Sequence, residues 1–316
     1  MNDDSKPPRP APLASASSGS FTPKPMEGAP GQKPRQPAGP NGPAYTNLDF
    51  MNGPEARTLR ILAEYLEPEK RFRDQDIKDT IVFFGSARIL SREQAEAAMK
   101  AARAGLDSQD DAETQAERLE RAELALTMSR YYEDTRELAK RLTLWSKSLA
   151  PSGKGRRFVV CSGGGPGIME AANRGASEVK GMNIGLNIEL PFEQKPNPFI
   201  THSLNIDFHY FFMRKFWFAY LAKAMIAMPG GFGTFDELTE ILTLIQTLKI
   251  KKKMPIVLFG TQFWREVIDF NALVKYGTIS RRDLDLMYRT DSVDDAYEHV
   301  TTELTRLYLD DTAATM

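Results

Sequence analysis

The sequence predicts an α/β protein with a Rossmann-like, doubly wound parallel sheet. Short apolar runs alternate with longer helical stretches, and glycine-rich turns follow several of these runs. Ligands of such sheets bind outside the carboxyl ends of the strands, where these turns are expected. We therefore expect a single domain over residues 46–316, with a small-molecule site at that edge of the sheet.

The first 45 residues differ in composition from the rest. Eleven of the chain's 20 prolines precede Ala44, among Ser, Gly, Ala and Lys and with almost no large apolar residues. Such a segment cannot offset the entropy lost on ordering. We expect a disordered tail over residues 1–45, with a partner-binding arm as the alternative.

The predicted elements follow in chain order. Pro54–Leu66 is expected to be a helix with proline near its start. The stretch Ser91–Leu149 is too long for one crossover, and its Glu/Ala/Arg/Leu-rich pattern, interrupted near 107–111, predicts an inserted helical hairpin. Most of the remaining connections are helical, so the strands are expected to be parallel. The five strands predicted from short apolar runs are Thr80–Gly85, Arg157–Ser162, Asn183–Ile188, Lys223–Met228 and Pro255–Gly260.

Charge and composition exclude several classes of function. The 316 residues carry 41 Lys and Arg against 42 Asp and Glu, so no overall field attracts nucleic acid or anionic membranes. The single cysteine, Cys161, forms no intrachain disulfide, and the three histidines lack metal-ligand spacing. No apolar run spans a bilayer or forms a signal-peptide core. A soluble, cytoplasmic protein without a bound metal is expected.

The most informative motif is the run Met-Pro-Gly-Gly-Phe-Gly-Thr-Phe-Asp-Glu at 228–237, between a predicted strand and an amphipathic helix. At such a junction, backbone N–H groups and the helix dipole favour an anion, and glycine allows close approach. Glu237 is expected in the first helical turn, about one turn from a bound phosphate. The alternative is a capping box of Thr234 and Glu237, which explains both residues by helix initiation alone.

A second glycine run, Ser162–Gly167, follows the second predicted strand, and Gly85-Ser86-Ala87-Arg88 follows the first. The run does not complete the dinucleotide fingerprint G-x-G-x-x-G, because Ile168 replaces its last glycine, and no P-loop is present. Two different glycine turns around one crevice therefore favour a phosphorylated small ligand over a dinucleotide.

The helix-like stretch His209–Phe218 contains Arg214 and Lys215 among large aromatic residues. Cations in so apolar a run need an anionic partner or a route to solvent. A carboxylate or phosphate partner is the favoured interpretation, and a structural salt bridge is the alternative. The aromatic residues over Tyr210–Tyr220 exceed what one helix face can bury, which predicts a homodimer or higher homo-oligomer.

Together, these residues resemble the LONELY GUY family of cytokinin riboside 5′-monophosphate phosphoribohydrolases and bacterial nucleotide nucleosidases, long labelled lysine decarboxylases. The resemblance covers about Ile81–Phe270 and lies in the P-G-G-x-G-T-x-x-E pattern at 229–237 and in Met213-Arg214-Lys215. It implies that Arg214 and Glu237 are the catalytic pair. The chain has Phe211-Phe212-Met213 where plant members have Met-His-Glu, so an ordinary purine nucleotide such as AMP is favoured over a cytokinin. The further substrate-binding residues that the resemblance suggests are Gly85, Ser86, Gly164, Gly165, Glu193, Lys215, Gly230, Gly231, Gly233, Thr234, Asp236 and Thr243.

The implied reaction is hydrolysis of a nucleoside 5′-monophosphate to free base and ribose 5-phosphate. Positive charge develops on the ribose as the base leaves, and a carboxylate such as Glu237 stabilises it or activates water. Arg214 orients Glu237 and the ribose, while phosphate binding positions the sugar. No metal or redox cofactor is required.

Three alternatives use other chemistry. A non-catalytic nucleotide sensor needs only the glycine motif. A dehydrogenase needs the complete fingerprint with an acidic residue about twenty positions later, and that combination is missing. A lysine decarboxylase needs a pyridoxal-binding lysine, which an absorbance scan detects.

Overall fold

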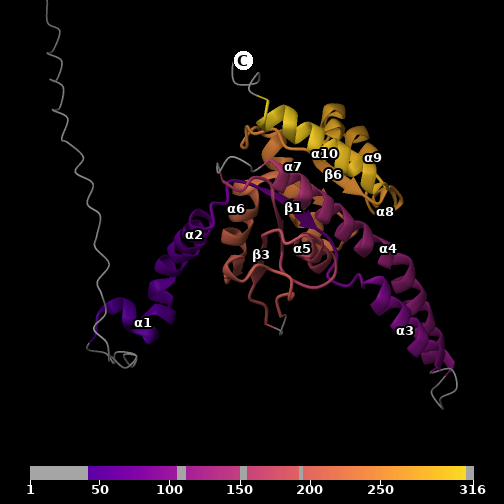
Figure 1. Cartoon of the computed structure of the whole chain (residues 1–316), viewed down its shortest axis with the longest axis horizontal. Coiled ribbons are helices and arrows are strands. Elements are labelled where there is room, and N and C mark those ends of the chain that lie inside the picture. The colour runs from indigo at the N-terminus through magenta and orange to yellow at the C-terminus, as the bar shows by residue number, and fades with distance from the viewer. Residues whose placement is uncertain (1–41, 105–111, 150–154, 192–194, 311–316) are drawn as a thin grey trace, which may run out of the picture. The chain divides into compact units, whose positions relative to one another are not determined.

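The computed structural model describes residues 42–104, 112–149, 155–191 and 195–310 (Figure 1). They divide into two compact units, with the boundary between Ala56 and Arg57. In the first unit, the 3-10 helices η1 (Ala44–Thr46) and η2 (Pro54–Ala56) flank α1 (Leu48–Asn52). The expected tail over residues 1–45 lies almost wholly outside the described residues.

The second unit is built on a seven-stranded, all-parallel sheet in the order β4-β3-β2-β1-β5-β6-β7. The predicted fold class is confirmed, and all five predicted strands are present. The strands are β1 (Thr80–Phe84), β2 (Val159–Ser162), β3 (Asn183–Ile188), β4 (Asn205–Phe208), β5 (Ala222–Ala227), β6 (Ile256–Phe259) and β7 (Met287–Thr290).

The sequence prediction missed β4 and β7. Both are edge strands of four residues, and each has exposed or half-buried positions between buried ones. They therefore lack the continuous apolar run that marks a strand buried on both faces.

The order of strands reverses beside β1. After β1 the chain adds β2, β3 and β4 outward in one direction, then returns to place β5 on the other side of β1. The carboxyl ends of β1 and β5 therefore form a topological switch point, where open α/β sheets bind their ligands.

Helices cover both faces of this sheet. One buried core contains side chains of α2 (Arg57–Asp74), α6 (Phe211–Leu221), α7 (Phe232–Gln246), α8 (Thr261–Val267) and α9 (Phe270–Lys275). The other contains side chains of α4 (Ala112–Ser148), α5 (Ile168–Glu178) and α10 (Val293–Tyr308). Short 3-10 helices, η4 (His202–Leu204) and η5 (Arg281–Leu286), precede β4 and β7.

Two helical predictions changed in their boundaries. The helix expected at Pro54–Leu66 is a 3-10 turn followed by α2, which continues to Asp74 with Pro68 inside it. The inserted hairpin is confirmed as α3 (Arg92–Ala104) packed on α4. Its expected interruption at 107–111 lies outside the described residues. No described helix is both long and apolar enough to cross a membrane.

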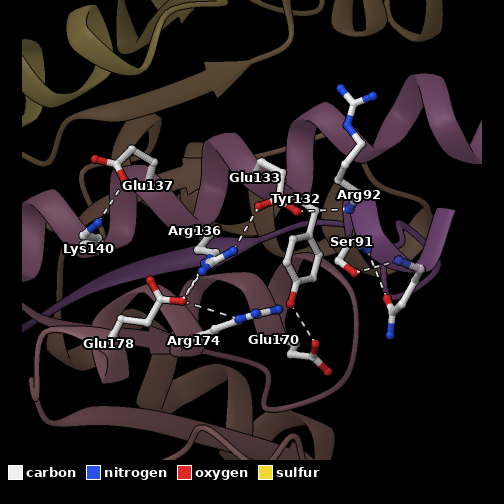
Figure 2. Close-up of polar contacts among 11 residues, drawn as sticks. Ser91, Arg92, Tyr132, Glu133, Arg136, Glu137, Lys140, Glu170, Arg174 and Glu178 are labelled. Atoms are coloured by element: carbon white, nitrogen blue, oxygen red, sulfur yellow. Dashed lines mark hydrogen bonds and ion pairs between the residues drawn. The ribbon is translucent and has the colours of Figure 1, made fainter. Parts of the chain in front are cut away.

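Polar contacts fix α4 on α5 (Figure 2). The buried Tyr132 hydroxyl donates to Glu170 over 2.7 Å, and burial raises the pKa of Tyr132, which keeps it a donor. Arg136 donates to Glu178 over 2.6 Å. Since Glu170 lies in the first turn of α5, the inserted hairpin supports the helix that begins directly after the second glycine run.

Candidate functional site

Three turns meet at the switch point. The backbone N–H of Ser86, after β1, donates to the carbonyl of Pro229, after β5, over 3.0 Å. The carbonyl of Ser86 accepts from the N–H of Ile168 over 3.1 Å, at the start of α5. A Cβ on Gly85 would lie 2.5 Å from a side-chain carbon of Ile168, so this glycine allows the turns to pack. The structure thus joins the three strand ends that the sequence marked as separate turns.

The turn at 163–165 is held by buried amide side chains. Gly164 has φ of +74°, and a Cβ there would lie 1.9 Å from the Asn187 side-chain oxygen. The side-chain amide of Asn197 donates to the carbonyls of Gly164 and Gly165 over 3.0 and 3.1 Å. The backbone conformation and the packing of this turn therefore account for its glycines without a ligand. Sequence analysis missed Asn187 and Asn197, because no motif marks an isolated asparagine until the fold buries it.

The glycines of the 229–233 motif are different. Gly230 lies against Thr234, whose hydroxyl oxygen would be 2.1 Å from a Cβ on that glycine. A Cβ on Gly231 or Gly233 would meet nothing within 4 Å, and neither residue has positive φ. Neither packing nor backbone strain requires glycine at these two positions, and the open space beside them is compatible with close approach of a ligand.

The capping-box alternative is wrong, and so is the expected place of Glu237. Helix α7 begins at Phe232 with Gly231 as its N-cap, and no side chain caps it. Thr234 lies inside the helix, with its side chain buried against Gly230. Glu237 is therefore the sixth helical residue, in the second turn rather than the first. The uncapped N–H groups at the start of α7 stay available to an anion.

Arg214, the fourth residue of α6, reaches over β3 and the turn after β2. Its Nε donates to the carbonyl of Leu186 in β3 over 2.9 Å. A Cβ on Gly163, after β2, would lie 2.6 Å from its Nη2, so the guanidinium occupies space that this glycine leaves. Burial lowers the pKa of Arg214, and the charge of Glu237 opposes that shift.

Glu237 is buried, with 7% of its surface exposed. Burial raises the pKa of its carboxyl group to about 7, while Arg214 and Lys215 act in the opposite direction. Within the described part of the chain, no hydrogen bond or ion pair occupies this carboxylate. A buried carboxyl group with a near-neutral pKa and unoccupied oxygens is suited to acid–base or electrostatic work on a ligand.

Lys215 has a different environment from its neighbour. Its Nζ lies 2.7 Å from an Asp236 oxygen and 3.1 Å from a Glu240 oxygen, so it links α6 to α7. For Lys215, the structural salt bridge proposed as the alternative is therefore observed. The pair Lys215–Asp236 aligns the two helices that carry Arg214 and Glu237.

Two predicted residues stand apart from this group. Thr243 is exposed in α7, about 16 Å along the helix from its start, and its hydroxyl donates to the Thr239 carbonyl over 2.7 Å. Glu193 lies outside the described residues. Five cavities, of about 140 to 590 Å³, also lie elsewhere, and none is lined by Arg214, Glu237 or Gly230.

The sheet and the three joined turns define an α/β protein of the Rossmann-like class with a candidate small-molecule site at its switch point. Residues 169–300, which include Arg214 and Glu237, match the family model described as "Possible lysine decarboxylase". The match confirms the resemblance to the LONELY GUY family that the motifs indicated. No curated protein matches the chain significantly.

Three solved structures that match this chain share little sequence identity with it. TM1055, a structural genomics target, is 16% identical with a TM-score of 0.40, covering 71% of this chain and 99% of its own. A Moco carrier protein from Chlamydomonas reinhardtii is 19% identical with a TM-score of 0.39, covering 73% and 99%. The molybdenum cofactor binding protein from Rippkaea orientalis is 19% identical with a TM-score of 0.35, covering 55% and 89%. Identities this low transfer neither a ligand nor an activity.

Proposed function

We propose that this protein hydrolyses the N-glycosidic bond of a nucleoside 5′-monophosphate, with AMP as the first substrate to test. The observation that carries the proposal is the buried Glu237 carboxylate, whose pKa is raised by burial and lowered by the charge of Arg214, beside the uncapped start of α7. The family match supports a small-molecule enzyme of this kind.

In the proposed complex, the 5′-phosphate binds the N–H groups at the start of α7. Gly231 and Gly233 leave open space there, and the helix dipole favours the negative charge. Because the phosphate does not react, its binding energy positions the ribose near Glu237.

In the proposed reaction, a water oxygen attacks C1′ of the ribose as the bond from C1′ to the base nitrogen breaks. The Glu237 carboxylate accepts the water proton or stabilises the positive charge on the ribose. The base leaves with the bonding electron pair and takes up a proton. Arg214 orients the ribose hydroxyls, and its charge favours the ionised form of Glu237. The bond from its Nε to the Leu186 carbonyl fixes the orientation of the guanidinium.

The test is incubation of the purified protein with AMP, adenosine and ATP, with the products separated by chromatography. We expect adenine and ribose 5-phosphate from AMP, and much slower release of adenine from adenosine, because the nucleoside lacks the anchoring phosphate. Equal turnover of AMP and adenosine would contradict phosphate anchoring. Tight AMP binding without any release of adenine would instead favour the non-catalytic sensor.

Substitution of Gly233 by Ala is expected to affect folding stability and ligand binding in opposite directions. A Cβ meets nothing in the protein and Ala is the better helix former, so stability is expected to rise by up to about 1 kcal/mol. The same methyl group faces the proposed phosphate position, so KM for AMP is expected to rise about tenfold or more. Thermal melts and steady-state kinetics measure both. An unchanged KM would contradict binding of the AMP phosphate at the start of α7.

We further propose that the protein acts as a homodimer built on α6 and α2. On α6, Phe212 and Tyr220 are 50% and 60% exposed, and the partly exposed Phe216 lies 5.6 Å from the Tyr65 ring of α2. Three further large apolar side chains are exposed on α2: Leu59, Leu62 and Leu66. Exposed large apolar side chains on two helices in contact are typical of a subunit interface.

The assembly prediction is that dissociation and loss of activity coincide, since α6 carries both Arg214 and the exposed aromatic residues. A stable interface buries on the order of 800 Å² per subunit. Light scattering and AMP hydrolysis over one dilution series measure mass and activity together. A fully active monomer would contradict both the interface and its link to catalysis.

A further inference from the structure

A second candidate site lies at the opposite end of the sheet. A cavity of about 590 Å³ is lined by Pro255 and Ile256 at the start of β6 and by Met287 at the start of β7. The glycine turns follow the carboxyl ends of β1, β2 and β5, so this cavity is separate from the proposed active site. Its volume lies within the range of small-molecule pockets.

Among the charged residues that line this cavity, basic side chains outnumber acidic ones. Its acidic members are fewer: Glu303 is paired with Arg306 over 2.5 Å, and Asp283 keeps its charge while accepting from the neutral Gln246 side chain over 2.7 Å. Asp285 is the third acidic residue. The basic residues of the lining are Lys251, Lys252, Lys253, Arg282 and Arg306.

Three of these basic side chains, Lys251, Lys253 and Arg282, form no ion pair within the described part of the chain. The pKa of Glu303 is lowered mainly by its hydrogen bond from Arg306 and also by the nearby charge of Lys253. Lys252 differs, because its Nζ donates to the carbonyls of Ala219 and Tyr220 over 2.6 and 2.9 Å. The Lys252 ammonium group is thus hydrogen-bonded to the end of α6. Its charge still adds to the positive electrostatic potential in the cavity.

Compensation of the helix dipole does not account for all of these charges. Lysines just after α7 stabilise its carboxyl-terminal carbonyls, which explains the segment 249–253 in part. Arg282, however, comes from η5, a separate element that converges on the same cavity. Burial also lowers the pKa of Lys252 to about 8, so a bound anion would stabilise its charged form.

We propose that this cavity binds a small polyanion carrying a pyrophosphate group. More than one negative charge is required to match the unpaired cations that converge from the α7–β6 loop and from η5. Beside them, the stacked rings of Tyr288 and His299, 4.0 Å apart, form a rigid part of the wall.

The probe is inorganic pyrophosphate, titrated calorimetrically into the full-length protein at constant ionic strength. All measurements use a Gly233→Asp background, because a carboxylate at the start of α7 repels anions from the proposed active site. The cavity variant is Lys251→Ala with Arg282→Ala. The control is Lys249→Ala with Arg281→Ala, which removes the same charge from the same two segments at residues outside the lining.

We expect the background protein to bind pyrophosphate and the cavity variant to lose about tenfold or more in affinity, since each charge-assisted contact contributes substantially. The control is expected to stay within about twofold. All four positions are exposed, so matching thermal melts are expected. No binding by the background protein, or equal losses in both variants, would overturn the proposal. Turnover of AMP is not measured, so this result is independent of the proposed function.

Discussion

Replacing Glu237 by Gln is expected to reduce kcat/KM for AMP at pH 8 by about a hundredfold or more, as for other positioned acid–base or electrostatic groups. Glutamine keeps the shape of the side chain but carries no negative charge for the ribose and is no base for water. The control is Glu298→Gln, an exposed position of α10. Steady-state kinetics on both variants measure the effect. Full activity of Glu237→Gln would contradict the assigned role.

The pH dependence of the wild-type enzyme tests the same carboxylate. Since burial raises the pKa of Glu237 to about 7, the charged form is populated only as pH rises through that value. If the charged form acts in catalysis, kcat/KM rises through about pH 7 and the Glu237→Gln variant lacks that limb. A wild-type profile that is flat from pH 5 to 9 would show that another group limits the reaction.

Stability should change in the opposite direction to activity. The folded-state pKa of Glu237 lies above the ordinary value of 4.5, so the folded protein binds the proton more tightly between those two values. The wild-type protein therefore loses stability as pH rises from about 4.5 to 7. Glutamine mimics the protonated form, so the variant is expected to be more stable at pH 8, by at most about 3 kcal/mol, with little difference below pH 4.5. Urea denaturation at both pH values measures it.

The sequence predicted the central part of the fold because buried parallel strands leave a clear signal. The five strands that the sequence predicted are the inner strands of the sheet. In β1, for example, every residue is buried. The edge strands β4 and β7 each include exposed or half-buried residues, so their short sequence patterns resemble those of loops. Strand order is a tertiary property, and only the structure shows that the turns after β1 and β5 are neighbours.

The sequence identified the turns of the candidate site correctly, but it did not predict how the individual residues are arranged there. Glycine patterns marked all three turns, but sequence could not separate Gly164, which is required by its backbone and by Asn187, from Gly233, which nothing in the fold requires. Thr234 and Glu237 fit a capping box by spacing, yet α7 starts at Phe232, because the glycines allow the helix to begin without a side-chain cap. Lys215 looked equivalent to Arg214, and only packing shows that its charge is used between helices.

Replacing Arg214 by Ala is expected to lower kcat/KM for AMP at pH 7 by about a hundredfold or more. The change removes the cation that opposes burial of the Glu237 charge, so the pKa of Glu237 is expected to rise further. The ascending limb of the pH profile should therefore move to higher pH, which loss of fold alone would not produce. The exposed Arg265→Ala variant of α8 serves as the control.

A second variant displaces the Arg214 guanidinium without removing its charge. A Cβ on Gly163 would lie 2.6 Å from Nη2 of Arg214 and 2.7 Å from Sδ of Met169, so Gly163→Ala must displace both side chains. Since positioned groups lose efficiency with small displacements, we expect an intermediate loss of activity, smaller than for Arg214→Ala. Arg214→Lys keeps a cation but loses the fixed planar fork that bonds the Leu186 carbonyl, so it should not restore activity. Wild-type rates in both Gly163→Ala and Arg214→Lys would show that Arg214 acts only as a diffuse positive charge, and that its placement over β3 and the turn after β2 has no part in catalysis.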